Sequence, residues 1–248
     1  MKKILKRIGL GIGILVVLII LFFVGYGIKA KSIIKVMSPV ETKQLVEKVF
    51  SIKDTFVNIF LIKDGDQYIA FDGGNDIKII SEELKKLDIN PDKIVAIFLT
   101  HTDADHIAAI ELFNNAKIYL SKEEEQMING ETSRFFIFGN SIGTNEYELL
   151  NNQEFISIGN LKIQGILTSG HTAGSMCFLV DDKYLFTGDA LSLKNGQIDN
   201  FPGFFNMDSE KATESIEKIT TLPKAEYIFT AHFGYSDDYS TAVKNWEK

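Results

Sequence analysis

The sequence predicts an α/β fold of mixed helix and strand layers, preceded by one membrane-spanning helix. Three observations predict it: an uncharged apolar run at 8–28, short apolar strands joined by tight turns, and amphipathic helical segments placed between some of those strands. The composition is that of a globular protein, with 45% hydrophobic residues, 24% charged residues and four prolines. At 248 residues, the chain holds one large domain or two small ones.

The amino-terminal segment is expected to cross a membrane. Residues 8–28 carry no charge, and about 20 apolar residues span the hydrocarbon core of a bilayer. A cleaved signal peptide is the weaker alternative, because the run exceeds the usual apolar stretch of about 7–15 residues and no clear cleavage site follows it. We therefore expect a membrane anchor at 1–35 and a second domain at 36–248.

Basic residues lie on both sides of this span. Four precede it and three follow it, so the positive-inside rule favours a cytoplasmic amino terminus only slightly. The short amino-terminal tail points the same way. We expect a single-pass membrane protein with its second domain outside the cytoplasmic membrane.

The charge of the remaining chain excludes some functions. Residues 1–35 carry seven basic residues and no acid, which leaves 19 basic and 33 acidic residues in the remainder, a net charge of −14. Nucleic-acid binding depends on Lys and Arg displacing counterions, so a nucleic-acid partner is not expected. The single cysteine, Cys177, excludes an internal disulfide and a cysteine-based zinc cluster, and we place it in the core.

The first half of the second domain is expected to alternate strands with one helix. Strands are predicted at 45–52, 56–62 and 68–71, the last two joined by a hairpin turn. The third strand ends at Asp72-Gly73-Gly74, where the glycines permit a sharp turn. Asp76 caps an amphipathic helix through Leu87, and a buried strand follows at 94–99.

The loop after that strand concentrates polar groups. It contains His101, Asp103, Asp105 and His106 between the strand and a short helix predicted at 107–113. Two imidazoles and two carboxylates in so short a loop are typical of a divalent-metal site. The alternative is a polar loop whose aspartate caps the helix.

The second half continues with hairpins and a helix. We expect a strand at 117–120, a helix start at 121–125, hairpins at 154–167 and 176–186, a helix at 209–221 and a strand at 227–230. The apolar, non-periodic connection at 130–151, with its run Phe135–Phe138, favours a functional flap over a simple linker. This run and the segment 201–205 either line an apolar mouth or pack in the core.

All four histidines directly follow predicted strands or hairpins. Asp72, His171, Asp189 and His232 share this position with the loop at 101–106. Because α/β folds gather functional groups where strands end, these residues are expected to form one site at a sheet edge.

These residues resemble those of the metallo-β-lactamase superfamily over about residues 45–235. The loop matches the family's His-x-His-x-Asp-His motif except that Asp103 replaces a histidine, and the segment Gly170–Ser175 matches its Gly-His-Thr-x-Gly-Ser turn. An aspartate after a strand (Asp189) and a late histidine (His232) complete the match. The resemblance implies a four-layer αβ/βα sandwich with metal ions at the sheet edges.

The resemblance also implies a ligand set for two divalent metal ions. His101, Asp103 and His171 would hold one ion, Asp105, His106 and His232 the other, with Asp189 bridging them and Asp72 supporting the site from the second shell. Zinc is expected first. A carboxylate at 103 is harder than an imidazole, so manganese and iron are alternatives, or Asp103 points away and leaves one site empty.

The activity implied is hydrolysis of a small-molecule substrate. Two cations lower the pKa of a shared water, whose hydroxide attacks an ester, lactone, thioester or related bond, and Asp105 would orient the hydroxide or pass on its proton as the catalytic residue. The Asp at 189 favours lactonase-like, glyoxalase-II-like and phosphoesterase-like members, although the 16 residues after His232 are too few for the glutathione-binding region of glyoxalase II. A phosphodiesterase or nuclease of the same fold remains an alternative, as does, in another class, a binding module without metal; no oligomeric state is predicted.

Overall fold

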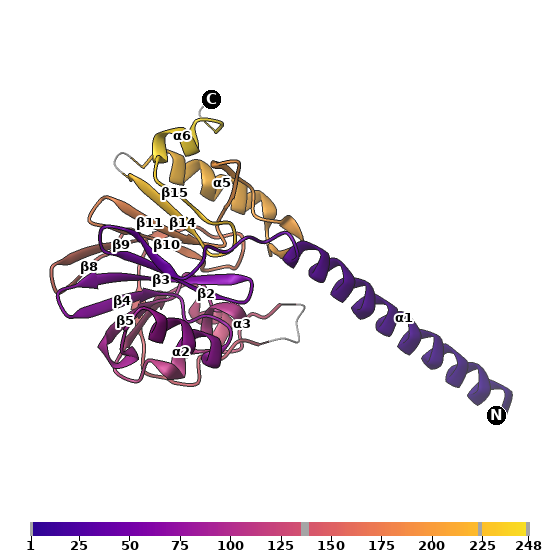
Figure 1. Ribbon diagram of the computed structural model, residues 1–248. Coiled ribbons are helices and arrows are strands. Elements are labelled where there is room, and N and C mark those ends of the chain that lie inside the picture. The colour runs from indigo at the N-terminus through magenta and orange to yellow at the C-terminus, as the bar shows by residue number, and fades with distance from the viewer. Residues whose placement is uncertain (1, 135–138, 223–224, 247–248) are drawn as a thin grey trace. The chain divides into compact units, whose positions relative to one another are not determined.

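The chain forms two compact units, Met1–Met37 and Ser38–Lys248. The computed structural model describes residues 2–134, 139–222 and 225–246. In the first unit, α1 (Lys2–Ile34) is one continuous helix (Figure 1). Within the described residues it is the one helix that is long and apolar enough to cross a membrane, and a signal sequence near the amino terminus would have the same features.

The second unit contains a seven-stranded mixed sheet in the order β1 to β7. Its first four strands pair antiparallel and the remaining pairs are parallel. The strands are β1 (Lys43–Val46), β2 (Val49–Asp54), β3 (Val57–Asp64), β4 (Gln67–Phe71), β5 (Ile94–Phe98), β6 (Lys117–Ser121) and β7 (Glu148–Leu150).

A six-stranded sheet in the order β15-β14-β11-β10-β9-β8 faces the first. Within it, β11 and β14 pair parallel and the other neighbours antiparallel. The strands are β8 (Phe155–Ile158), β9 (Leu161–Leu167), β10 (Met176–Val180), β11 (Tyr184–Gly188), β14 (Tyr227–Thr230) and β15 (Tyr235–Ser236), and a separate hairpin joins β12 (Ser192–Lys194) to β13 (Gln197–Asp199).

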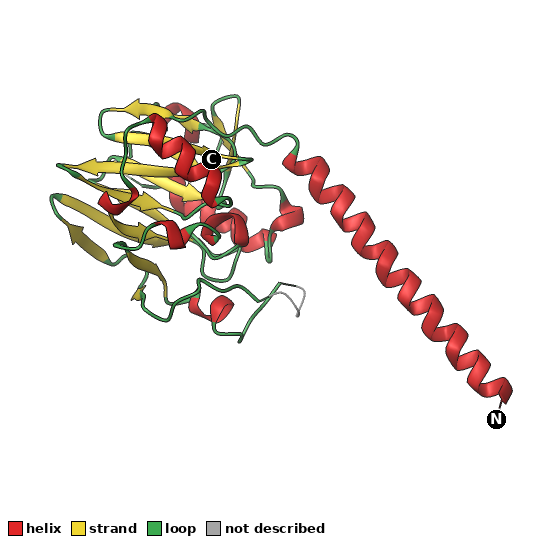
Figure 2. Cartoon of the chain, turned by 60° about the horizontal axis from the view of Figure 1, so that its bottom comes forward, coloured by secondary structure: helices red, strands yellow, loops and turns green. Residues whose placement is uncertain are grey.

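Helices cover the outer face of each sheet (Figures 1 and 2). The first sheet carries α2 (Ile77–Lys86), α3 (Ala104–Ile107), α4 (Glu125–Ile128) and the 3₁₀ turns η1 (Pro91–Lys93) and η2 (Ile110–Leu112). The second carries α5 (Ser209–Thr220), α6 (Tyr239–Val243) and the 3₁₀ turn η3 (Gly203–Phe205).

Three apolar cores hold these layers together, as the four-layer sandwich requires. The core between the sheets is aromatic, with Phe71 stacked on Phe186 at 3.8 Å between ring centroids and on Phe98 at 5.9 Å. The outer cores pack α2 against the first sheet through Ile80 and α5 against the second through Ile216. The predicted α/β sandwich is therefore confirmed.

Several local predictions differ from the structure. The strand predicted at 45–52 is two strands, because Glu47 adopts a φ of 21° and turns the chain back. The helix predicted at 107–113 begins earlier, at Ala104, and is interrupted at Ala109, whose φ of −108° and ψ of 15° depart from helical values before the 3₁₀ turn η2. The β12–β13 hairpin and α6 were not predicted, and the Phe135–Phe138 run lies outside the described residues.

Candidate metal centre

The strand ends of both sheets bring the seven candidate ligands together. The loop after β5 supplies four of them, and the segments after β9, β11 and β14 supply one each. We call this set the His–Asp cluster: His101, Asp103, Asp105, His106, His171, Asp189 and His232. Its four imidazoles are at most 2% exposed.

Among the described residues, the cluster contains three overlapping groups whose ligand atoms lie within 4.8 Å of one another: a first, His101–Asp103–His171; a second, Asp105–His106–His232; and one that joins them, His101–His106–Asp189. In the first group, Asp103 Oδ2 lies 3.2 Å from His171 Nε2 and 3.7 Å from His101 Nε2. Two ligands on one tetrahedral zinc ion, each about 2.0–2.1 Å from it, are about 3.3 Å apart. The first group therefore has the spacing that a single ion requires.

The second group has similar spacing. Asp105 Oδ2 lies 3.4 Å from His232 Nε2 and 3.8 Å from His106 Nε2. The side chain of Asp105 is 23% exposed, so this group has one carboxylate that solvent reaches.

Asp189 lies between the two groups. Its Oδ2 is 3.4 Å from His171 Nε2 in the first group, and its Oδ1 is 3.2 Å from His232 Nε2 in the second. Buried atoms without a hydrogen-bond partner among the described residues include Asp189 Oδ1, His101 Nε2 and His106 Nε2. Buried polar atoms are costly without a partner, and a metal ion would satisfy all three, so the residues fit the metal that the pattern implies.

Each cluster histidine turns its Nε2 into the site because the protein binds its Nδ1. His106 Nδ1 lies 2.9 Å from Asp72 Oδ2, and His232 Nδ1 lies 2.7 Å from the carbonyl of Phe56. The other two Nδ1 atoms contact Asn206 Oδ1 (His171, 3.2 Å) and Thr100 Oγ1 (His101, 3.1 Å). Partners of this kind fix the tautomer and orientation of metal-binding histidines.

Asp72 lies behind the cluster rather than in it. Its carboxylate accepts hydrogen bonds from the Thr100 N–H at 2.8 Å and from Thr100 Oγ1 at 2.9 Å, besides its contact with His106. Gly73, next along the chain, donates its N–H to the carbonyl of His106, where an added Cβ would lie 3.2 Å from that oxygen. Asp72 and Gly73, at the end of β4, thus hold the 101–106 loop in place through Thr100 and His106.

The pKa values of the cluster follow from burial and from mutual charge. Burial lowers the pKa of His101, and the neighbouring imidazoles lower it further. Burial disfavours the charged forms of His106 and His232, but the surrounding carboxylates outweigh it and raise both pKa values. For Asp103 and Asp189, burial is outweighed by nearby imidazoles, so both carboxyl pKa values are lowered. Ionised carboxylates are the form that binds a cation.

Arg134 is part of this site and was not predicted. Its guanidinium binds Asp103 through two parallel contacts, Nε to Oδ1 at 2.9 Å and Nη2 to Oδ2 at 2.5 Å. Asp103, by contrast, makes no capping hydrogen bond to α3. The signal was available in the composition: Arg7 and Arg134 are the chain's two arginines, against 24 lysines. The two-point contact with Asp103 uses the planar fork of arginine, which lysine lacks.

Glu124 was also missed. This buried carboxylate accepts hydrogen bonds from the N–H and Oγ1 of Thr102, at 2.8 and 2.7 Å, and from Thr172 Oγ1 at 2.6 Å and the Gly174 N–H at 3.1 Å. It thereby ties the loop after β5 to the turn that carries His171. Gly174 is required there because an added Cβ would collide with the backbone of Glu123 and Glu124.

Aromatic rings pack against two of the imidazoles, those of His171 and His232. Phe201 is buried with its ring centroid 5.0 Å from that of His171 and 5.8 Å from that of His232, while Phe56 stacks on His232 at 5.7 Å. Phe201 thus packs against the cluster, and Phe204 and Phe205 are half-buried. Cys177 lies in the core as expected, fully buried, and burial raises the pKa of its thiol to about 12.

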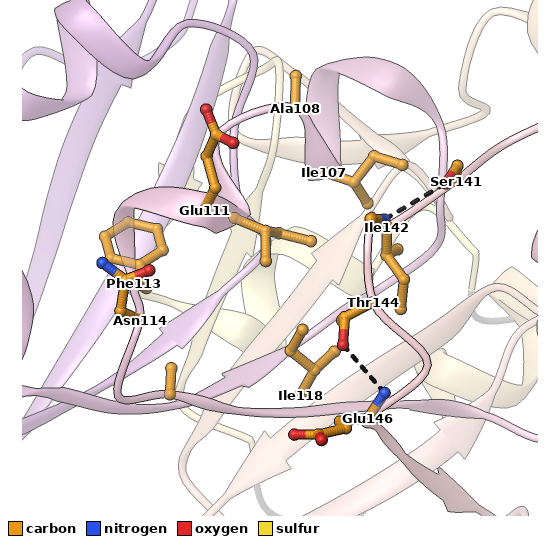
Figure 3. A pocket seen from close by; sticks show the side chains of 13 residues that line it. Ile107, Ala108, Glu111, Phe113, Asn114, Ile118, Ser141, Ile142, Thr144 and Glu146 are labelled. Carbon is orange, nitrogen blue, oxygen red and sulfur yellow. Dashed lines mark hydrogen bonds between the residues drawn. The ribbon is translucent and has the colours of Figure 1, made fainter.

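A separate pocket opens on the helix side of the first sheet (Figure 3). Its lining includes Ile107 and Glu111, which follow the 101–106 loop, and Ile142 and Thr144 from the connection before β7. None of the seven cluster residues is among the described residues that line it.

The comparisons with known proteins agree with this geometry. Residues 52–232 match the model of the "Metallo-beta-lactamase superfamily". A protein named "Probable metallo-hydrolase MJ0296" from Methanocaldococcus jannaschii is 32% identical over 156 residues, which cover 63% of this chain and 65% of that protein. The "Probable polyketide biosynthesis zinc-dependent hydrolase PksB" of Bacillus subtilis is 30% identical, with 69% of this chain and 70% of that protein aligned.

A curated enzyme with a named substrate is also similar. The "Hydroxyacylglutathione hydrolase" of Glaesserella parasuis is 31% identical over 154 residues, covering 60% of this chain and 54% of the enzyme. Among solved structures, a subclass B3 metallo-β-lactamase with an active-site glutamic acid superposes with a TM-score of 0.64 at 17% identity, covering 85% of this chain and 87% of that one.

The layered fold, the His–Asp cluster and the family match together define a metallo-hydrolase. The chain belongs to the metallo-β-lactamase superfamily.

Proposed function

We propose that the chain hydrolyses an ester, lactone, thioester or related bond with two divalent metal ions, zinc before manganese or iron. The observation that carries this proposal is the position of Asp189, whose Oδ2 faces His171 of the first group and whose Oδ1 faces His232 of the second. A carboxylate with one oxygen toward each of two ligand groups has the arrangement of a bridging ligand.

His101, Asp103 and His171 would hold one ion, and Asp105, His106 and His232 the other. When bound, the two ions supply Lewis-acid polarisation of the substrate and a lowered pKa for water at the site. Asp105 serves as the proton carrier, because its carboxylate is 23% exposed and so lies beside both the cluster and solvent, whereas the Asp103 carboxylate is paired with Arg134. Asp72 acts on the chemistry through the histidines, by holding the Nδ1–H of His106 directly and by binding Thr100 Oγ1, which contacts Nδ1 of His101.

Carbonyl substrates are favoured over phosphodiesters. A body with a net charge of −14 repels a polyanionic backbone, and Phe201 places an apolar surface against the cluster. The similar hydroxyacylglutathione hydrolase favours the same class by its name. The phosphodiesterase or nuclease alternative has in its favour the His-x-Asp-x-Asp-His pattern and Asp189, which phosphoesterase-like members share with the lactonase-like ones. A binding module without metal is disfavoured by Asp189 Oδ1, His101 Nε2 and His106 Nε2, which are buried and have no hydrogen-bond partner in the part of the chain that the structure describes.

A hydrolysis panel on zinc-loaded protein tests this proposal. We expect turnover of lactones or thioesters, with β-lactams and phosphodiesters slower, and loss of turnover in Asp189→Ala. The matched control is Asp199→Ala, since that partly exposed carboxylate lies in the β12–β13 hairpin. Turnover at the parental rate in Asp189→Ala would contradict the bridging role, and turnover of phosphodiesters alone would favour the alternative.

We also propose that residues 1–35 anchor the protein in the membrane in a single pass through 8–28, with residues 36–248 forming the catalytic domain on the extracytoplasmic side. The length and apolar character of α1 support the span. Before protease treatment, the protein should then fractionate with membranes. Protease treatment of intact spheroplasts should degrade the catalytic domain. A domain that survives until lysis would reverse the orientation, and release into the medium would indicate a cleaved signal sequence.

A further inference from the structure

The guanidinium of Arg134 lies within the first ligand group. Besides its two contacts with Asp103, its Nη2 lies 3.1 Å from His171 Nε2, and its Nη1 donates to the carbonyl of Phe205 at 2.6 Å. The side chain is 19% exposed. Arg134 is therefore held from the cluster side and from the Gly203–Phe205 turn, which is the arrangement of a built contact rather than a surface ion pair.

The contact with His171 takes up a ligand atom. Because Asn206 Oδ1 lies 3.2 Å from Nδ1 of this imidazole, the proton belongs on Nδ1 and the lone pair on Nε2. A ring nitrogen has one lone pair, so Nε2 cannot accept from Arg134 and bind a metal ion at the same time.

The contact with Asp103 acts in the same direction. Both oxygens of this carboxylate face the guanidinium, which keeps its positive charge at all physiological pH values. A cation entering the first group meets a carboxylate that is already neutralised and a fixed like charge beside it. The second group differs in its carboxylate: among the described residues, the ion pairs of Asp105 are with His106 and His232 and not with a guanidinium.

We propose that Arg134 competes with metal for the first group, so that the two groups fill in order. The Asp105–His106–His232 group binds its ion first, and the His101–Asp103–His171 group binds a second ion only when the guanidinium moves away. This inference rests on the proposed function in taking the cluster as a metal centre. The aspartate at 103 is what permits it, since a histidine there would offer no bidentate partner to an arginine.

Zinc titration of the full-length, detergent-solubilised apoprotein against a chromophoric chelator of known affinity tests the inference without using activity. Arg134→Met keeps the aliphatic length and removes the charged fork. Arg134→Lys keeps the charge and removes the fork. Lys122→Met, an exposed position, controls for the loss of one positive charge.

Two binding steps of unequal affinity are expected for the parent protein. Arg134→Met should tighten the weaker step about tenfold or more, the factor for one charge-assisted hydrogen bond, and leave the stronger step unchanged. Arg134→Lys should tighten it less, and Lys122→Met should match the parent. His171→Ala should remove the weaker step and His232→Ala the stronger one.

Other outcomes separate the inference from the proposed function. If the weaker step in Arg134→Met is unchanged or weaker still, Arg134 does not compete with metal, although the metal centre itself stands. If the parent binds two ions with equal affinity, ordered filling is wrong. If neither the parent nor Arg134→Met binds zinc, both the inference and the proposed function fail.

Discussion

Asp72 Oδ2 accepts a hydrogen bond from His106 Nδ1 at 2.9 Å, in a buried contact between the end of β4 and the short helix α3. The contact leaves His106 Nε2 facing Asp189 Oδ1 at 3.6 Å and Asp105 Oδ2 at 3.8 Å. Asp72, which lies outside the His–Asp cluster, thus sets the direction of the His106 imidazole in the second group.

Replacing Asp72 by Asn should weaken zinc binding in the second group. The amide keeps the shape and an acceptor for His106, but it loses the charge that supports the imidazole and the second acceptor for Thr100. Removing an outer partner of this kind weakens metal affinity by about 10- to 100-fold. The same zinc titration measures it, with Asp66→Asn in the exposed β3–β4 turn as the control. Parental affinity in Asp72→Asn would show that Asp72 has no such role.

Glu124→Gln should destabilise the fold. Four donors converge on the carboxylate, so an amide NH₂ there must face a donor and lose at least one hydrogen bond. The expected loss of about 2–3 kcal/mol lowers the Tm by about 5–10 °C for a domain of this size. Thermal unfolding by circular dichroism measures the shift, and exposed Glu131→Gln should leave the Tm at the parental value. Equal Tm values for the two variants would contradict the bridging role of Glu124.

Gly174→Ala should disturb the turn that carries His171. The added methyl group would meet the backbone of Glu123 and Glu124, which cannot move aside as a flexible side chain can. We expect a cost of about 1–3 kcal/mol and a weaker first group in the zinc titration. Gly139→Ala provides the control, because an added Cβ there meets no atom of the described residues within 4 Å. If both variants bind zinc like the parent, the close approach at Gly174 is not needed for the site.

Cys177 should be unreactive in the folded protein. Its thiol is fully buried, and burial raises its pKa from the ordinary value of 9.0 to about 12, so the reactive thiolate is scarce at pH 8. A chromogenic disulfide reagent should label the native protein far more slowly than the urea-unfolded protein. Equally fast labelling of both would place Cys177 at the surface.

The residues that face the site were predictable because they are chemically distinctive. Histidines are scarce in this chain: His101, His171 and His232 lie within a few residues of a strand end and His106 lies in α3 close to His101, so their positions predicted a single candidate site. The apolar run that contains Ile97 and Phe98 predicted the buried strand before the loop, and both side chains are fully buried.

The supporting residues were not predictable because their roles depend on distant partners. Glu124 is one of three consecutive glutamates, and nothing local separates it from its exposed-looking neighbours; its partners Thr102 and Thr172 are 22 and 48 residues away. Arg134 depends likewise on Asp103, 31 residues earlier.

The central claim is that the His–Asp cluster binds metal ions, and anomalous X-ray scattering from crystals grown with excess zinc tests it most directly. We expect two zinc peaks, one among His101, Asp103 and His171 and the other among Asp105, His106 and His232, each within bonding distance of Asp189. Crystals that contain zinc elsewhere but show no peak at these side chains would contradict the account.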